Sequence, residues 1–126
     1  VLIKGAEGIG TGWSTSVPRF NPLDLIENIK RILTGQDLED LVPWYSGFTG
    51  TFEPDPKKEG TFICRGIYEI DEYTNTVHIT ELPVGTWTQT YKEFLEQNLI
   101  DTGSNTAFIT DIKEYHAEMT IDFKIQ

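Results

Sequence analysis

The amino-acid sequence predicts an α+β fold, in which an antiparallel or mixed β-sheet is combined with two main helices. Two stretches carry apolar residues at helical spacing between recognisable start and stop signals. Much of the remaining chain alternates apolar and polar residues with a period of two, which is typical of strands that have one covered face. The chain has 126 residues, 38% of them hydrophobic, which suffices for a core, and we expect a single domain over residues 1–126.

A glycine-rich stretch comes first, Gly5-Ala6-Glu7-Gly8-Ile9-Gly10-Thr11-Gly12-Trp13. We expect a loop here, because glycine tolerates backbone angles that other residues avoid and lets another molecule approach the backbone closely. Ile9 stands between two glycines, and its β-branch restricts the side chain to few rotamers. Two interpretations stay open at this point: a turn whose isoleucine packs into the core, or a loop that inserts Ile9 into a partner.

The first helix is expected to begin at Asn21-Pro22, because asparagine is a preferred N-cap and proline suits the first helical position. Gly35 is placed to end it. Its apolar residues share one face, which we expect to lie in the core: Leu25, Ile26, Ile29, Ile32 and Leu33. Residues 14–20 before this helix are expected to form an extended loop, and residues 36–41 after it a short helical turn.

Three strands are expected next, over Phe48–Glu53, Thr61–Ile70 and Thr76–Leu82. Gly66 inside the second strand predicts a β-bulge, and residues 71–75 are expected to connect the second and third strands as a hairpin. The bend at residues 43–48, which precedes them, holds three aromatic residues and no basic one. This composition favours packing over stacking on nucleic-acid bases.

The second helix is expected to start at a capping box formed by Thr86 and Gln89 and to run to about Leu99. The residues predicted to face inward are its large apolar ones, Trp87, Tyr91, Phe94 and Leu95. A loop over Asp101–Asn105 and two last strands, Phe108–Ile112 and Met119–Ile125, complete the expected fold.

Charge is distributed unevenly along the chain, whose formal net charge is −10. Residues 1–36 carry +1 and the remainder −11. Because an acidic surface repels nucleic acid, any contact with DNA is expected to come from the first third of the chain. No apolar run approaches the roughly 20 residues of a membrane span, so no membrane partner is expected. The single cysteine, Cys64, cannot form a disulfide within the chain.

No self-contained active site or metal site is predicted. His116 lies between Glu114 and Glu118, but this spacing matches no metal-binding signature, and we expect structural or surface roles for His116 and His78. Cys64 has no neighbouring base in the sequence and is interpreted as a small core residue. The glycine stretch lacks the lysine and hydroxyl residue that end a phosphate-binding loop, and its glycine order differs from the dinucleotide fingerprint.

The glycine stretch and the residues after it resemble the DNA-gate segment of eukaryotic-type DNA topoisomerase II. The similarity covers residues 5–15, followed by Pro18, Phe20, Asn21 and Pro22. It then continues in order along nearly the whole chain, through Pro43-Trp44-Tyr45, Gly47-Phe48-Thr49-Gly50-Thr51, Ile79-Thr80-Glu81-Leu82-Pro83, Thr86-Trp87-Thr88, Tyr91-Lys92-Glu93 and Glu114-Tyr115-His116.

The resemblance implies a fragment of an ATP-dependent type IIA topoisomerase, which cuts one duplex, passes another through the break and reseals it. The fragment would be the tower of the DNA-cleavage region, with residues 1–20 as a DNA-facing segment and residues 21–126 as an α+β body. In this family the isoleucine of the Gly-Ile-Gly-Thr-Gly-Trp motif wedges between base pairs and bends the duplex, a role that transfers to Ile9. Contacts with the DNA backbone are expected from Lys4, Gly8, Gly10, Thr11, Ser14 and Arg19.

The partners implied by the resemblance are double-stranded DNA, the rest of the topoisomerase chain and its homodimer partner, in the nucleus. The parent enzyme would use Mg²⁺ and ATP. The family's nucleophilic tyrosine, magnesium-binding carboxylates and ATPase lie outside this motif, so the fragment alone is expected to be inactive and to hold no cofactor or metal. None of its five tyrosines matches the nucleophile's motif.

Two departures from the family pattern stand out. Lys4 occupies a position where the family usually has asparagine, and Gly85 one where it usually has arginine. The second weakens the expectation of a DNA contact from the turn at residues 82–87. Two other functions stay open: a standalone acidic α+β protein-interaction module, favoured by the acidic body, and a small nucleotide-binding enzyme that uses the glycine stretch.

Overall fold

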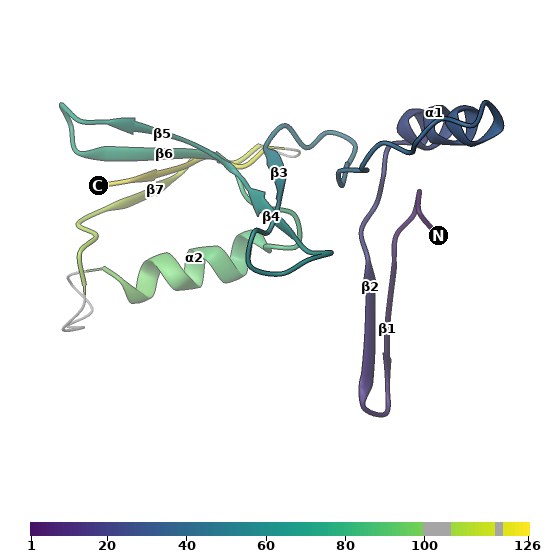
Figure 1. Ribbon diagram of the computed structural model, residues 1–126. Helices are drawn as coiled ribbons and strands as arrows, with labels where there is room; N and C mark the ends of the chain where they lie inside the picture. Colours follow the sequence, from purple (N-terminus) through teal and green to yellow (C-terminus); the bar gives the residue numbers. More distant parts are fainter. Residues whose placement is uncertain (100–106, 118–119) are drawn as a thin grey trace. The chain divides into compact units, whose positions relative to one another are not determined.

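The computed structural model describes residues 1–99, 107–117 and 120–126, and within them the chain is α+β, as predicted (Figure 1). The elements in chain order are β1 (Ala6–Gly10), β2 (Trp13–Val17), α1 (Pro22–Leu33), β3 (Thr51–Pro54), β4 (Phe62–Arg65), β5 (Ile67–Asp71), β6 (Thr76–Glu81), α2 (Thr88–Gln97), β7 (Ile112–Glu114) and β8 (Phe123–Ile125). They fall into two compact units. The first comprises Val1–Phe48 and Phe52–Ile63, and the second Thr49–Thr51 and Cys64–Gln126. The expected division into residues 1–20 and 21–126 within one domain stays a prediction.

The glycine-rich stretch is a β-hairpin, and the loops predicted for residues 5–13 and 14–20 were wrong. β1 pairs antiparallel with β2, with Ala6 opposite Val17 and Gly10 opposite Trp13. Thr11 and Gly12 make the two-residue connection, in which Gly12 has a φ of +77° that suits glycine. Strand pairing uses backbone groups, so alternate glycines do not prevent it.

The base of this hairpin is held by several backbone contacts. Gly5 has a φ of +69°, and a Cβ there would lie 2.8 Å from the carbonyl oxygen of Val17, so the position requires glycine. The amide of Phe20 donates to the carbonyl of Leu2 at 2.8 Å, and the amide of Trp44 donates to the carbonyl of Arg19 at 2.8 Å. The first bond joins the two chain segments at the hairpin base, and the second joins that base to the segment that follows α1.

Helix α1 begins and ends where the sequence predicts. The side chain of Asn21 accepts a hydrogen bond from the amide of Leu23 at 3.0 Å, and Gly35 just beyond the helix has a φ of +71°. The expectation that its apolar face lies in the core was wrong, because no residue of α1 is buried and the side chains of Ile26, Ile29 and others are exposed. An amphipathic pattern predicts a face suited to burial, but not which layer covers it.

Residues 36–41 are not helical, in contrast to the prediction. Asn28 holds this segment against α1 instead. Its side-chain amide donates to the carbonyl of Glu39 at 2.9 Å and accepts from the amide of Glu39 at 3.0 Å. Arg31 also forms an ion pair with the Glu39 carboxylate. The polar side chains of one helix turn therefore satisfy backbone groups that a second helix would have paired internally.

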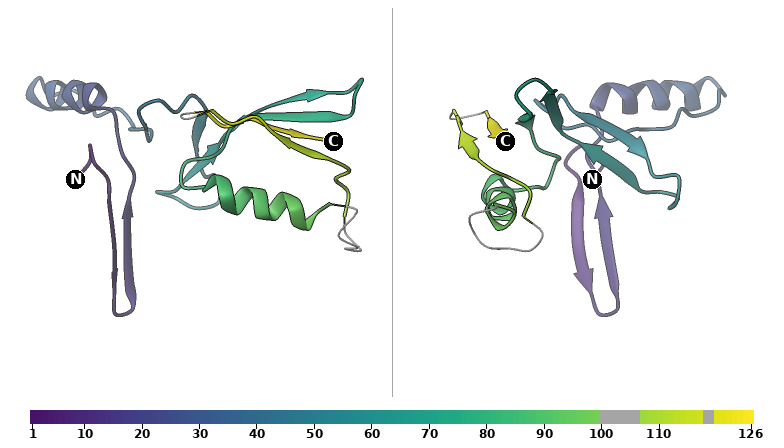
Figure 2. Two further views of the ribbon diagram at one scale, coloured as in Figure 1. Left: turned by 180° about the vertical axis from the view of Figure 1, so that it is seen from behind. Right: turned by 90° about the vertical axis from the view of Figure 1, so that its left-hand side faces the viewer.

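The second unit is built on a four-stranded antiparallel sheet with the order β5-β6-β8-β7, and α2 lies along one face of it (Figures 1 and 2). Its core consists of Ile79, Leu82, Leu95, Ile109 and Phe123. Separate from this sheet, β3 and β4 form a two-stranded sheet. The hairpin predicted at residues 71–75 is confirmed by the antiparallel pairing of β5 with β6.

The strand predicted over Thr61–Ile70 is divided at Gly66 into β4 and β5. The irregularity expected at Gly66 lies one residue further along, where the register between β5 and β6 shifts between Ile67 and Tyr68. A Cβ at Gly66 would lie 2.0 Å from the carbonyl oxygen of Glu81, so the backbones approach too closely for any other residue.

The capping box predicted for α2 was wrong. The N-cap is Trp87, which makes no side-chain capping bond. Thr86 lies in the preceding turn, where its backbone amide donates to the carbonyl of Pro83 at 3.1 Å. Leu95 is buried and Tyr91 packs against the core as predicted, whereas Trp87 and Phe94 are exposed. Phe94 instead stacks on Tyr91 with ring centroids 6.0 Å apart.

Each of the remaining predicted strands overlaps a strand of the structure, but the bounds differ. The strand expected over Phe48–Glu53 overlaps β3 in its second half, whereas the strand expected over Phe108–Ile112 shares only Ile112 with β7. The strand expected over Met119–Ile125 is shortened to β8, and its first residue lies outside the described residues. The loop expected over Asp101–Asn105 also lies outside them.

Glu81 at the end of β6 binds the segment before β3. Its carboxylate accepts hydrogen bonds from the amides of Thr49 at 2.9 Å and Gly50 at 2.8 Å, and from the Thr49 hydroxyl at 2.8 Å. A carboxylate that accepts several backbone bonds is a strong local tether. Two segments of the family resemblance, 47–51 and 79–83, thus meet in space.

Candidate nucleic-acid interface

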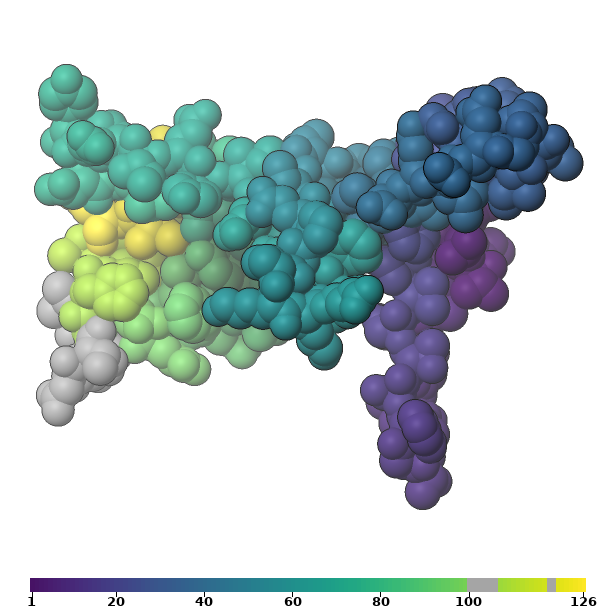
Figure 3. All heavy atoms as spheres, viewed as in Figure 1, coloured from purple at the N-terminus to yellow at the C-terminus, as the bar shows by residue number. Residues whose placement is uncertain are grey.

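Ile9 lies near the tip of the β1–β2 hairpin and is 95% exposed. The alternative in which its side chain packs into a core is therefore excluded for this structure. In the space-filling view the hairpin is a narrow ribbon, with its tip clear of the other residues of the first unit (Figure 3). A large, stiff aliphatic group presented to solvent in this way is suited to contact with another molecule.

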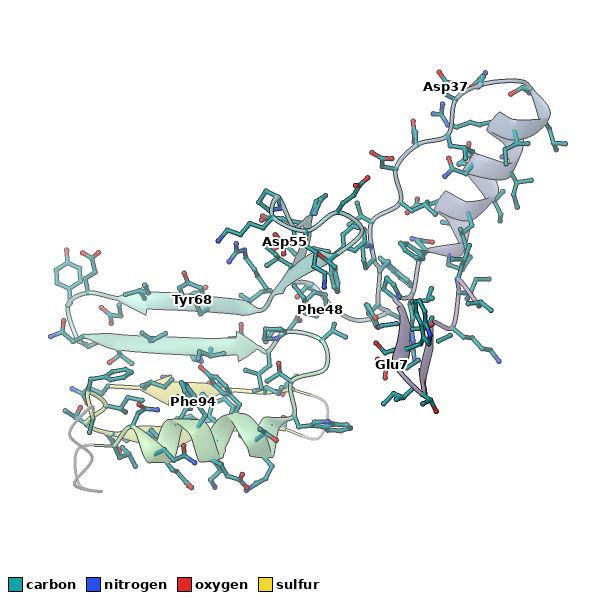
Figure 4. The ribbon with its side chains drawn as sticks, turned by 60° about the horizontal axis from the view of Figure 1, so that its bottom comes forward. Glu7, Asp37, Phe48, Asp55, Tyr68 and Phe94 are labelled. Carbon is teal, nitrogen blue, oxygen red and sulfur yellow. The ribbon has the colours of Figure 1, made fainter. Side chains whose placement is uncertain are left out.

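The strand register places the hairpin side chains on two opposite faces. Residues directly opposite each other in an antiparallel pair share a face, and neighbours along a strand alternate. Ile9 is opposite Ser14, and Glu7 is opposite Ser16, so these four share the surface that we call the duplex face. Glu7 marks this part of the hairpin in Figure 4.

Gly8 and Gly10 flank the isoleucine, and the hairpin itself does not require glycine at either position. Neither has a positive φ. A Cβ at Gly8 would meet nothing within 4 Å, and one at Gly10 would come no nearer than 3.9 Å to the carbonyl oxygen of Trp13. The fold therefore has room for side chains at both positions, and the hairpin does not account for their absence.

The other residues expected to contact DNA lie in two groups. Thr11 and Ser14 are exposed at the tip with Ile9. Lys4 and Arg19 lie at the base, where Nε of Arg19 donates to the carbonyl of Lys4 at 3.1 Å and its guanidinium carbon lies 5.7 Å from the ring centre of Tyr45. No basic residue occurs between Gly5 and Pro18 in the sequence, so positive charge is confined to the base.

The two histidines and the cysteine each make contacts with other residues of the fold. Nε2 of His78 lies 2.5 Å from a carboxylate oxygen of Asp122, and Nδ1 of His116 accepts the amide of Asp122 at 3.0 Å. His116 also packs edge-on against Phe123 with centroids 4.6 Å apart. The sulfur of Cys64 accepts the amide of Val84 at 3.3 Å. Glu118, considered with His116 in the sequence, lies outside the described residues.

The described parts of the chain offer no metal centre. No group of three or more His, Cys, Asp or Glu residues within them is arranged to hold a metal ion. Burial raises the pKa of the Tyr91 phenol, which opposes its ionisation and therefore its use as a nucleophile. No helix in the same residues is long and apolar enough to cross a bilayer.

The comparisons with known proteins identify the family. The family model for the A-type subunit of DNA gyrase/topoisomerase IV matches residues 1–126. The chain belongs to this type II topoisomerase family. It is 44% identical to DNA topoisomerase 2 of Arabidopsis thaliana over 99% of the chain, and 43% identical to DNA topoisomerase 2-alpha of Mus musculus over all of it. It spans only 8% of the length of each of these relatives.

A solved structure agrees with this assignment. The fold superposes with a TM-score of 0.85 on the crystal structure of the Plasmodium falciparum topoisomerase II DNA-binding, cleavage and re-ligation domain, with 40% sequence identity. The match covers 98% of this chain and 16% of that one. The predicted resemblance to eukaryotic-type topoisomerase II and the predicted fold class are both confirmed. The chain is thus a topoisomerase fragment.

The sequence did not predict three features of the site, which are the hairpin, its two faces and the exposure of Trp13. A signal for the hairpin was present, since Thr11-Gly12 is a two-residue turn candidate between segments that alternate small and larger residues. The departure at Gly85 also has a structural counterpart, because its φ of +87° is a conformation that glycine adopts more readily than arginine.

Proposed function

We propose that this chain is the DNA-bending part of a type IIA DNA topoisomerase, an ATP-dependent enzyme that passes one duplex through a transient double-strand break in another. The observation that carries the proposal is the 95% exposure of Ile9 at the hairpin tip. In this role Ile9 enters the stack of the cleaved duplex from the groove and kinks it.

The energetics favour a wedge that works together with other contacts. Unstacking one base step costs on the order of a few kcal/mol. Full burial of an isoleucine side chain returns about 1.5–3 kcal/mol. The wedge therefore offsets much of the cost by itself, and the rest comes from the additional protein surface that a bent duplex touches.

The proposed contacts with the DNA backbone fall into two groups, one at the tip of the hairpin and one at its base. Ser14, beside Ile9 on the duplex face, and Thr11 at the turn donate hydroxyl hydrogen bonds to phosphate oxygens near the kink. Gly8 and Gly10 flank Ile9 along β1, and we propose that DNA approaches the backbone there along the edge of the strand. Lys4 and Arg19 attract more distant phosphates from the hairpin base, which matches the confinement of positive charge to that end.

The rest of the strand-passage reaction belongs to other parts of the parent protein. Among the described residues, no His, Cys, Asp or Glu side chains form a group of three or more that could hold Mg²⁺. We propose that the parent is a nuclear homodimer that uses Mg²⁺ and ATP, with cleavage chemistry and ATP hydrolysis outside residues 1–126. The fragment then contributes binding and bending without catalysis.

A duplex that contains 2-aminopurine at the step next to the kink tests the proposal in the full-length parent enzyme. This base becomes more fluorescent when it is unstacked. Binding of the wild-type enzyme is expected to raise the fluorescence, and binding of the Ile9→Ala enzyme is not. Ile70→Ala is a matched control, because Ile70 is also an exposed strand isoleucine, 62% accessible, but belongs to β5 of the second unit. An equal rise with Ile9→Ala would refute the insertion of Ile9.

A further inference from the structure

The second face of the hairpin differs in chemistry from the duplex face. The register places Trp13, Thr15 and Val17 of β2 opposite Gly10, Gly8 and Ala6 of β1. We call this surface the apolar face, because it consists of these six residues and none of them is charged. The duplex face, by contrast, carries the Glu7 carboxylate and the hydroxyls of Ser14 and Ser16 beside Ile9.

Trp13 dominates the apolar face and is 83% exposed. Its direct cross-strand neighbour, Gly10, has no side chain to pack against the indole, and neither has Gly8 one pair further along. An indole is among the largest apolar groups a chain can bury, and it is enriched where proteins contact each other. The strip of bare backbone beside it allows a second surface to come close.

For Ile9 to open a base step, the hairpin must be held in place on the face opposite Ile9. A two-stranded ribbon is marginally stable by itself in water, and a wedge that opens a base stack experiences an equal force in return. Ile9 and Trp13 project from opposite faces, so a surface that contacts Trp13 lies directly behind the wedge. Such a contact would hold Ile9 in place while the duplex bends.

We propose that the apolar face packs against an apolar surface of the parent protein outside residues 1–126, with Trp13 as the anchor. A parent of similar length to the matching proteins would provide ample protein for this, because the match covers only 16% of the Plasmodium falciparum chain and 8% of the Arabidopsis thaliana relative. The DNA backbone fits the duplex face better, because the hydroxyls of Ser14 and Ser16 there can donate hydrogen bonds to phosphate oxygens, whereas four of the six residues on the apolar face have no side-chain donor. This inference rests on the role proposed for Ile9.

Photo-crosslinking in the full-length enzyme identifies what covers the face. The crosslinking amino acid p-benzoylphenylalanine is placed at position 13, and the enzyme is irradiated with and without DNA. The expected products join position 13 to protein outside residues 1–126 in both conditions. Crosslinks to DNA, to residues 1–126 of either protomer, or no protein crosslink at all would each overturn the proposal.

A measurement on the unmodified enzyme guards against disturbance by the crosslinker. Hydroxyl-radical oxidation of Trp13 in the DNA-free, full-length enzyme is expected to be several-fold slower than in the urea-unfolded enzyme. Rapid oxidation that DNA alone suppresses would show that Trp13 faces the duplex, and would overturn the proposal.

A DNA-bending assay on Trp13 and Ile9 variants tests the contact at Trp13 separately from the role proposed for Ile9. Trp13→Ala is expected to reduce the bent fraction of bound duplex several-fold although Ile9 is intact, and Trp13→Phe to retain most of it because phenylalanine still packs. Undiminished bending in Trp13→Ala, together with loss of bending in Ile9→Ala, would refute the support role alone. Undiminished bending in Ile9→Ala would refute the proposed function.

Discussion

Replacement of Ile9 by alanine separates the stability of the fold from the energy of DNA bending. The side chain is 95% exposed, so its truncation removes almost no contact within the protein. Substitutions at such surface positions usually change the free energy of unfolding by less than about 0.5 kcal/mol. We therefore expect the Ile9→Ala enzyme to unfold at the wild-type temperature and denaturant concentration.

In the complex with bent DNA the same truncation is costly. Alanine lacks three carbon atoms of the isoleucine side chain, and each buried methylene contributes about 0.8 kcal/mol. The bent state should lose about 2.4 kcal/mol, which corresponds to roughly a sixtyfold change in the equilibrium between bent and straight duplex. Ile9→Val removes one carbon and keeps the β-branch, so it should shift this equilibrium only about fourfold.

Energy transfer between dyes at the two ends of a bound duplex measures the bent fraction directly. The full-length enzyme is used at saturating concentration, so that a change in affinity is not mistaken for a change in bending. The reasoning predicts the order wild type, Ile9→Val, Ile9→Ala, with Ile70→Ala equal to wild type. Undiminished transfer in Ile9→Ala, or a loss that accompanies a lowered melting temperature, would refute it.

Three further predictions concern the second unit, and each is checked by urea unfolding at equilibrium. Gly66→Ala should destabilise the fold by at least about 1–3 kcal/mol, because the new Cβ would lie 2.0 Å from the carbonyl oxygen of Glu81. Glu81→Gln should cost about 1–3 kcal/mol, since an amide cannot accept all the hydrogen bonds that Thr49 and Gly50 donate to the carboxylate; an unchanged value would show that the tether contributes nothing. Burial raises the pKa of Tyr91 above its ordinary value of 10.0, so the stability that this phenol contributes is complete below pH 10 and falls as the pH rises through the raised pKa; Tyr91→Phe should abolish that part of the decline.

Local signals predicted the ends of α1 and the hairpin between β5 and β6. Asn21 and Gly35 act on backbone groups within one turn of the helix, so their effect is visible in a short window of sequence. The start of α2 was misplaced for the same kind of reason. Thr86 has the chemistry of a cap, but its amide is engaged by the Pro83 carbonyl in a turn that precedes the helix.

Burial was predicted less well than secondary structure. The apolar face of α1 and the side chains of Trp87 and Phe94 were expected to lie inside, and none of these residues is buried in this structure. Periodicity shows which side of an element is apolar. Whether another layer covers that side depends on residues distant in sequence, which the pattern does not contain.

By itself the sequence determined the family, through the glycine motif around Ile9, and the boundaries of α1. Only the tertiary structure decided that Ile9 is exposed, that it shares a face with Ser14 and Ser16, and that Trp13 projects from the other side. The reason is that capping and turn signals act between residues close along the chain, whereas the face on which a side chain lies follows from the register between paired strands. In a ribbon so rich in glycine, backbone hydrogen bonds set that register, and the side-chain pattern records little of it.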